Sequence, residues 1–394
     1  MPDPILNAIA LLAFTILVGH ASAFVFRKTK VPDVIILLLF GLLIGYLGFV
    51  RMDLFRAIAP ILTPLTLIIV LLDSGLNMEL AQVIRSFSRS ILLAVGGLIF
   101  SMVASAIVGV LAMGLDLKMA LLVGAIFGGT SSVTVLAILR GISVGKTVYS
   151  LLSLESVFND ALCILVSIAV LGTIIPGLGA GSSPLMIVFE FGVGIAIGAL
   201  YGLIWLMVLN KYKGVKFDFI LTLAAAMLVY SGSEFVFGMG TGAIAILFFG
   251  LMLGNAGSFS KVTKRRYSFP PNILEFHSGI TFAMRSFFFV YLGLVATIRM
   301  EYLFYGVVLS AALMISRLVA VQLAMVGTFI SKPELNLIRV MGTKGLVAAA
   351  LTQIPVTYGV PGAELIQNIA FVVILSTTIY AAVGTAVIAR GKSL

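Results

Sequence analysis

Residues 151–167, LLSLESVFNDALCILVS, decide the fold class of this chain. The stretch is apolar enough to lie inside a bilayer, yet its first part contains Glu155, Ser156, Asn159 and Asp160. A carboxylate at the centre of a membrane costs about 2.5–3.5 kcal/mol on insertion scales, so such residues usually mark a pathway or a binding site. At helical spacing Ser156 and Asp160 lie one turn apart, and Glu155 and Asn159 form the adjoining row. The stretch therefore predicts a membrane helix with two polar rows.

The composition of the 394-residue chain predicts an all-α polytopic membrane protein. Hydrophobic residues make up 61% of it and charged residues 10%, and its mean hydropathy is +1.21, which no soluble domain reaches. The formal net charge of +10 fits basic cytoplasmic loops, so we expect no nucleic-acid partner. One cysteine and two histidines argue against a disulfide framework or a histidine metal site, and no cofactor is expected. The N-terminal MPDPILNAIA lacks the features of a signal peptide, so the first apolar run predicts a retained helix.

Apolar runs of about 17–25 residues predict the membrane spans. Thirteen such runs cover residues 4–26, 32–50, 57–77, 90–114, 118–140, 147–172, 184–209, 217–237, 240–256, 273–297, 301–327, 334–358 and 363–389. The third of them is interrupted by Pro60 and Pro64.

Lysine and arginine are distributed unevenly between the loops. If the N-terminus lies outside, the outer loops contain only Arg51, Arg56, Lys118 and Arg299, and the inner loops contain most of the others. The positive-inside rule then predicts a cell-membrane protein with an outside N-terminus and a cytoplasmic C-terminus. The basic run at residues 261–266 is predicted to anchor a cytoplasmic loop on anionic membrane lipid.

Internal similarity predicts two halves of six spans each. Three matches occur in the same order in both halves: residues 38–45 with 247–254, residues 75–76 with 293–294, and residues 129–132 with 342–345. The single linking span at 184–209 gives the halves opposite orientations, which is the inverted repeat of secondary transporters. In such folds, helices broken near the midplane offer backbone groups to ions. The glycines at 128–129 and 342–345 predict breaks in the fifth and twelfth spans, which cross at the midplane.

These features resemble the NhaP-like sodium/proton antiporters, a group of monovalent cation:proton antiporters. The most specific match is Glu155-Ser156-x-x-Asn159-Asp160, and the resemblance covers nearly all of the chain. Further matches are the break at Thr130, Arg317, the Gly-Thr-Lys-Gly break at 342–345, Pro32 with Gly41 and Gly45, and Tyr230-x-x-x-Glu234.

The resemblance implies an electroneutral exchange of one cation for one proton by elevator-type alternating access. Residues 1–394 would form a single transporter domain with two parts that move relative to each other. The expected dimerisation part covers about 1–80 and 217–297, the core about 90–172 and 301–389, and the linker helix 184–209. A homodimer is expected from the same resemblance.

The resemblance also implies roles for individual residues. Asp160 would bind the cation and the proton in competition. Ser156, the backbone around Thr130, and Asp73 would complete the ion shell. The residue types themselves add Ser131, which gives an all-oxygen set of the kind that hard cations prefer. The expected supporting residues are Asn159 at the crossing of the broken helices, Glu155 paired with Arg317, and Lys344 beside the helix ends.

One departure from the family pattern affects the expected cation. The family has Thr-Asp-Pro where this sequence has Thr130-Ser131-Ser132, so a carboxylate and a proline are missing. Sodium or lithium is the cation expected from the resemblance, and potassium stays open as the alternative. Asp73 has a second interpretation as an interfacial charge, and Lys344 has one as a charge carrier.

Functions from other classes also stay open at this point. A cation channel would use a polar path through the membrane, although it requires a continuous pore. The sequence has no Gly-x-Ser-x-Gly or His-Glu-x-x-His motif, so we do not expect an enzyme. Arg285 lies inside a predicted span without a partner that the sequence identifies.

Overall fold

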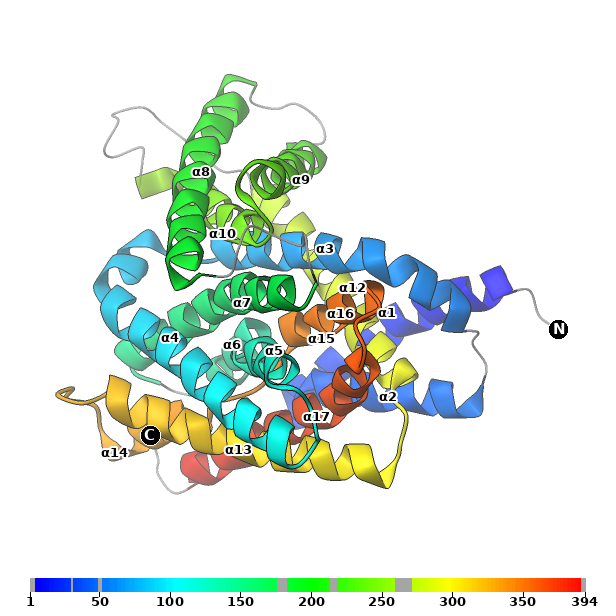
Figure 1. The fold of residues 1–394 in the computed structure, drawn as a ribbon. Coiled ribbons are helices and arrows are strands. Elements are labelled where there is room, and N and C mark those ends of the chain that lie inside the picture. The colour runs from blue at the N-terminus through cyan, green and yellow to red at the C-terminus, as the bar shows by residue number, and fades with distance from the viewer. Residues whose placement is uncertain are drawn as a thin grey trace.

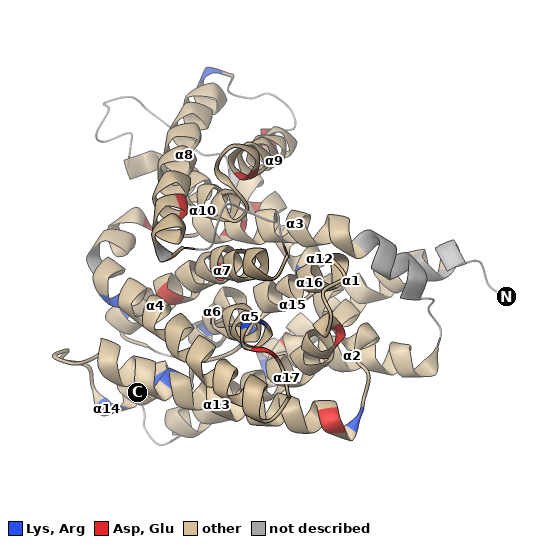
Figure 2. Cartoon of the chain, in the orientation of Figure 1, with Lys and Arg blue, Asp and Glu red and all other residues tan. Residues whose placement is uncertain are grey.

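The computed structural model describes residues 4–29, 31–48, 52–142, 144–175, 183–212, 218–258 and 271–390. Every regular element in these ranges is a helix, which confirms the predicted all-α class (Figure 1). Lysine, arginine, aspartate and glutamate are sparse along the helices, as expected for membrane spans (Figure 2). The basic run at 261–266, which the sequence predicts to anchor a loop, lies outside the described residues.

The helices follow the predicted spans closely. The first half contains α1 (Pro4–Thr29), α2 (Asp33–Leu47), α3 (Met52–Leu76), α4 (Leu80–Leu111), α5 (Leu117–Phe127), α6 (Ser132–Arg140) and α7 (Lys146–Ile174). The linking helix is α8 (Pro184–Lys211). The second half contains α9 (Asp218–Phe237), α10 (Thr241–Gly254), α12 (Pro271–Val295), α13 (Met300–Ala324), α14 (Lys332–Val340), α15 (Leu346–Leu351), α16 (Gln353–Thr357) and α17 (Ala363–Arg390).

Each predicted span coincides with one helix or with a broken helix. Ten helical segments of the described chain are long and apolar enough to cross a membrane, and α2, α10 and the segment α15–α16 are apolar but shorter. The number thirteen therefore stays a prediction. The third span is one helix, because α3 continues through Pro60 and Pro64. Membrane helices tolerate proline inside the helix.

Two helix crossings between the halves have the same close contact between glycines. A Cβ atom on Gly293 of α12 would lie 3.1 Å from the Cα of Gly41 in α2. A Cβ atom on Gly250 of α10 would lie 3.2 Å from the Cα of Gly75 in α3. By the internal similarity α2 corresponds to α10 and α3 to α12, so the α2–α12 crossing is equivalent to the α10–α3 crossing, and each joins one helix from each half. This reciprocal packing is what an inverted repeat requires.

Most of the helices belong to two packed groups (Figure 1). In the first group α2 packs along α12, and α10 packs along both α3 and α8. In the second group α4 packs on α5, α7 and α13, and α13 packs on α17. In Figure 1, α8, α9 and α10 lie together at the top of the view, α13, α14 and α17 lie at the bottom, and α7 runs between them.

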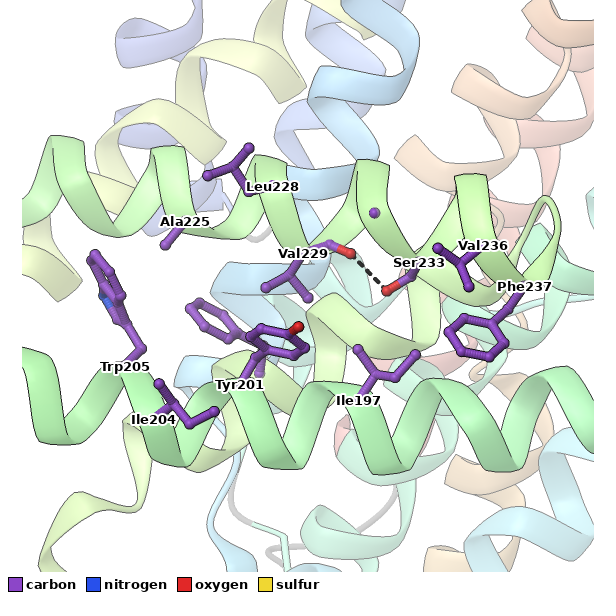
Figure 3. A pocket seen from close by; sticks show the side chains of 12 residues that line it. Ile197, Tyr201, Ile204, Trp205, Ala225, Leu228, Val229, Ser233, Val236 and Phe237 are labelled. Carbon is purple, nitrogen blue, oxygen red and sulfur yellow. Dashed lines mark hydrogen bonds between the residues drawn. The ribbon is translucent and has the colours of Figure 1, made fainter.

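An apolar groove of about 560 Å³ lies between α8, α9 and α10 (Figure 3). Tyr201 and Ile197 of α8 face Val229 and Val236 of α9 across it, and the Ser233 hydroxyl donates to the Val229 carbonyl. No charged side chain lines this groove among the described residues, so we look for ion chemistry elsewhere.

Candidate ion-binding site

Two helix breaks meet in the centre of the molecule. The first separates α5 from α6 at residues 128–131, and the second separates α14 from α15 at residues 341–345. The Ser131 side chain caps α6 by accepting from the Thr134 amide. The Ser131 amide donates to the carbonyl of Thr343 at 2.8 Å, so the two breaks cross and are bonded directly. Backbone groups that a continuous helix would use internally are therefore available here.

Glu155 of α7 lies at the centre of the polar contacts around this crossing. Its side chain is 0% exposed. Its Oε1 atom accepts from the Thr130 hydroxyl at 2.9 Å and from Asn159 Nδ2 at 2.6 Å, and Asn159 also donates to Thr130 Oγ1 at 3.2 Å. Glu155 and Asn159 thus connect α7 to the first break. Asn159 lies beside the crossing of the broken helices, where the sequence analysis expects it.

Arg317 of α13 neutralises Glu155. Its Nη1 atom lies 2.7 Å from Glu155 Oε1, and its Nη2 atom donates to Oε2 at 3.1 Å, a bidentate ion pair. The same guanidinium donates to the carbonyl of Ile338 in the last turn of α14. The pair expected from the sequence is present, and it also binds the helix that precedes the second break.

Lys344 connects the second break to the first. Its Nζ atom donates to the carbonyl of Gly129 at 2.9 Å, just beyond the C-terminal end of α5. Its backbone amide donates to the Thr377 hydroxyl of α17 at 3.2 Å. A cation beside helix-terminal carbonyls offsets their partial negative charge, which is the arrangement expected for Lys344.

Asp160 is a buried carboxylate beside the crossing, and the described part of the chain places no cationic side chain in an ion pair with it. Its side chain is 5% exposed and forms no ion pair within the described part of the chain. Its Oδ2 atom accepts from the Ser132 hydroxyl at 2.6 Å, and the Ser132 backbone also contributes a hydrogen bond. Ser132 is the first residue of α6, so the carboxylate faces the positive end of a helix.

The hydroxyl that bonds to Asp160 is that of Ser132, and not that of Ser131 or Ser156, which the sequence analysis expects as ion ligands. The Ser131 hydroxyl donates to Thr134 Oγ1 at 3.1 Å because its position as the cap of α6 turns it along that helix. The Thr130 hydroxyl is engaged by Glu155. The Ser156 hydroxyl donates to the Ser153 carbonyl at 3.0 Å and does not bond to Asp160. The side chains of residues 130, 131 and 132 point in different directions because the chain is not helical where it leaves α5 and enters α6. Sequence spacing does not specify these directions.

A polar cavity of about 350 Å³ reaches Ser132 from one side of the molecule. Its polar lining residues include Asp73, Asn77, Arg140, Ser278 and Arg285. The Asp73 carboxylate accepts from Ser278 at 2.9 Å and from Asn77 at 3.2 Å. The structure therefore places Asp73 in the approach to the crossing, where its carboxylate bonds to Ser278 and Asn77 and the Asp160 carboxylate bonds to Ser132.

Arg285 has a partner that the sequence analysis misses. Its Nη2 atom lies 2.6 Å from Asp33 Oδ2, and α2 and α12 pack along each other at this point. The available signal is the single carboxylate at the start of the span 32–50, but the pairing of these two helices is not visible in the sequence. Arg285 is thus an ion-paired residue at the wall of the cavity.

The fold and this site together define a class of protein. A polytopic helical chain has two inverted halves, crossed helix breaks and, in its described part, a buried carboxylate that has no cationic partner and is bonded to a serine at the wall of a polar cavity. Such an arrangement is that of a membrane secondary transporter for small cations.

Comparisons with known proteins specify the family. The family model described as "Sodium/hydrogen exchanger, transmembrane" matches residues 10–391. The chain belongs to this sodium/hydrogen exchanger family.

Named relatives include antiporters for two cations. The chain is 30% identical over 379 residues to a K(+)/H(+) antiporter NhaP2 of Shewanella sp. (strain MR-4), covering 93% of this chain and 62% of that protein. It is 28% identical over 383 residues to Na(+)/H(+) antiporter 1 of Methanocaldococcus jannaschii, covering 92% of this chain and 85% of that protein. The chain thus spans less than two thirds of the NhaP2 relatives it matches.

A solved structure has the same fold. The structure of the sodium proton antiporter MjNhaP1 from Methanocaldococcus jannaschii at pH 8 superposes with a TM-score of 0.81, at 23% identity, covering 97% of this chain and 100% of that chain. This likeness agrees with the inverted-repeat architecture predicted from the sequence.

Proposed function

We propose that this chain is a secondary antiporter that exchanges one monovalent cation for one proton, with both competing for Asp160. The observation that carries the proposal is a buried carboxylate with a hydroxyl donor and without a cationic partner among the described residues. A cation or a proton would each neutralise it, whereas Glu155 is already neutralised by Arg317. Since both ligands carry one positive charge, the exchange would be electroneutral.

The transport step would be an elevator movement of the core against the dimerisation part. The tight packing inside each helix group supports this division, with α2, α3, α10 and α12 in one part and α4, α7, α13 and α17 in the other. The cavity that ends at Ser132 would be the cytoplasmic approach, because Arg140 lies in it and the positive-inside rule places that end inside. With this orientation the N-terminus is outside and the C-terminus cytoplasmic.

The opposite approach would be closed in this conformation. The Tyr291 hydroxyl of α12 donates to Gln353 Oε1 of α16 at 3.1 Å, which links the two parts. Gln367 of α17 donates to the same oxygen at 3.0 Å. Alternating access would require the bond between Tyr291 and Gln353 to break when the core moves.

The cation is proposed to be sodium or lithium, with potassium as the second candidate. The potassium candidate is favoured by the name of the NhaP2 relatives and by Ser131 standing where the family pattern has a carboxylate. Introducing Ser131→Asp would restore that carboxylate, and a changed preference between sodium and potassium would identify position 131 as the cause.

A homodimer is proposed from the apolar faces that the single chain leaves uncovered. Only 22% of the span residues in α1 and 17% in α9 are buried inside the molecule. These faces would contact a second copy or membrane lipid, and crosslinking in native membranes would distinguish the two.

The test is proton movement in proteoliposomes, followed with a pH-sensitive dye after adding sodium, lithium or potassium. We expect dequenching with the wild type and none with Asp160→Asn. Glu301→Gln, at an exposed carboxylate in the first turn of α13, is the matched control and should exchange normally. Exchange by Asp160→Asn would refute the proposed site, and large currents would favour a channel.

A further inference from the structure

Ser132 lies between the polar cavity and Asp160. It lines the cavity, and its hydroxyl donates to Asp160 Oδ2 at 2.6 Å. The side chain is 2% exposed, so it forms part of the inner wall of the site. Asp160 does not line the cavity, so an ion that approaches through the cavity meets Ser132 before it meets the carboxylate.

The Ser132 hydroxyl, which donates to Asp160, can also act as an ion ligand. A hydroxyl has one proton to donate and two lone pairs to offer. A distance of 2.6 Å is that of a charge-assisted bond from a hydroxyl to a carboxylate. When a cation binds to the carboxylate, rotation of the hydroxyl would turn its oxygen toward the cation, and alkali cations prefer such oxygen ligands.

The neighbouring hydroxyls do not have this freedom. The Thr130 hydroxyl bonds to Glu155, and the Ser131 hydroxyl bonds along α6 to Thr134. The Ser156 hydroxyl bonds to a carbonyl of its own helix. Ser132 is therefore the one hydroxyl of this group that the described structure bonds to Asp160.

We propose that Ser132 is a cation ligand and a specificity-determining residue of the exchange site. Its hydroxyl donates to Asp160 when the site holds no cation and coordinates the cation when the site is loaded. A proline, which stands at this position in the Thr-Asp-Pro pattern, provides neither a hydroxyl nor an amide donor. The inference rests on the proposed antiport function and names a ligand that the resemblance does not supply.

The experiment measures the cation dependence of exchange in proteoliposomes for Ser132→Ala. Loss of a polar ligand to a charged group should raise the KM for the preferred cation about tenfold and leave the maximal rate nearly unchanged. Ser132→Thr keeps the hydroxyl and should restore most of the affinity. Ser167→Ala is the matched control, since Ser167 is also a buried serine, lies on the same helix as Asp160, and has a hydroxyl without a partner in the described structure.

A second measurement covers the case in which Ser132→Ala transports too little to analyse. Cation binding stabilises the folded protein in proportion to its affinity, so the Tm in detergent is recorded at increasing cation concentration. We expect Ser132→Ala to need about tenfold more cation than the wild type for the same rise in Tm.

The outcomes separate this inference from the proposed function. A wild-type KM and wild-type cation dependence of Tm in Ser132→Ala, with Asp160→Asn inactive, would overturn the ligand role and leave the antiport proposal intact. Exchange by Asp160→Asn would overturn the antiport proposal itself. An equal increase in KM with Ser132→Ala and Ser132→Thr would also overturn the ligand role, because the hydroxyl would then be irrelevant.

Discussion

The backbone amide of Ser131 donates to the carbonyl of Thr343 at 2.8 Å, so two helix breaks from opposite halves of the chain are joined by one hydrogen bond. Lys344 Nζ adds a second bond between the breaks through the Gly129 carbonyl. Glu155, Asn159 and Arg317 surround this crossing with linked hydrogen bonds and one ion pair. The crossing is thus held by its own network, whereas the Asp160 carboxylate accepts a hydrogen bond from Ser132.

Breaking the Glu155–Arg317 pair from one side should destabilise the protein strongly. Glu155→Gln or Arg317→Gln leaves an uncompensated charge at a buried site, which costs about 3–5 kcal/mol. The double variant Glu155→Gln with Arg317→Gln should recover part of the loss. Thermal unfolding in detergent checks this, and a double variant that is less stable than both single variants would contradict the pairing.

Replacing Lys344 should weaken the contact between the breaks. Lys344→Met removes the donor to the Gly129 carbonyl, and a buried unsatisfied carbonyl costs about 1–3 kcal/mol. Lys118→Met is the comparison, because Lys118 Nζ donates to the Thr173 carbonyl at 2.9 Å in an exposed position. We expect a clear drop in Tm for the first and little change for the second. Equal Tm values would show that the bond from Lys344 contributes nothing.

Arg285 and Asp33 should be coupled energetically. Their side chains are 13% and 12% exposed, so losing one partner leaves the other poorly solvated. A double-mutant cycle of Asp33→Asn and Arg285→Leu should give a coupling energy of roughly 1–3 kcal/mol in thermal unfolding. A coupling energy near zero would mean that the two charges act independently.

The glycine crossing between α3 and α10 should not accept a side chain. A Cβ atom on Gly250 would lie 2.6 Å from the Leu72 carbonyl oxygen, so Gly250→Ala forces the helices apart at a cost of about 1–3 kcal/mol. Gly96→Ala in α4 is the control, because no atom lies within 4 Å of its added Cβ. Monodisperse yield and Tm should fall for Gly250→Ala only, and a stable Gly250→Ala variant would argue against this tight crossing.

Much of the architecture follows from short-range signals in the sequence. Runs such as residues 147–172 predict helices because a membrane span needs an apolar stretch of fixed length. The glycine pairs at 128–129 and 342–345 predict the two breaks because glycine weakens a helix locally. The similarity of residues 38–45 to residues 247–254 predicts the inverted halves. These properties depend on the neighbouring residues along the chain, which the sequence contains.

Composition and residue spacing were sufficient to identify an all-helical membrane protein in which Asp160 lies on a polar row of a membrane helix. Only the tertiary structure decided that Ser132 bonds to Asp160, that Ser131 turns along α6, and that Asp33 neutralises Arg285. The physical reason is that side-chain directions in a non-helical break, and the pairing of helices distant in sequence, follow from packing in three dimensions. Composition and periodicity fix which residues are buried in a membrane, whereas the fold fixes which of them touch.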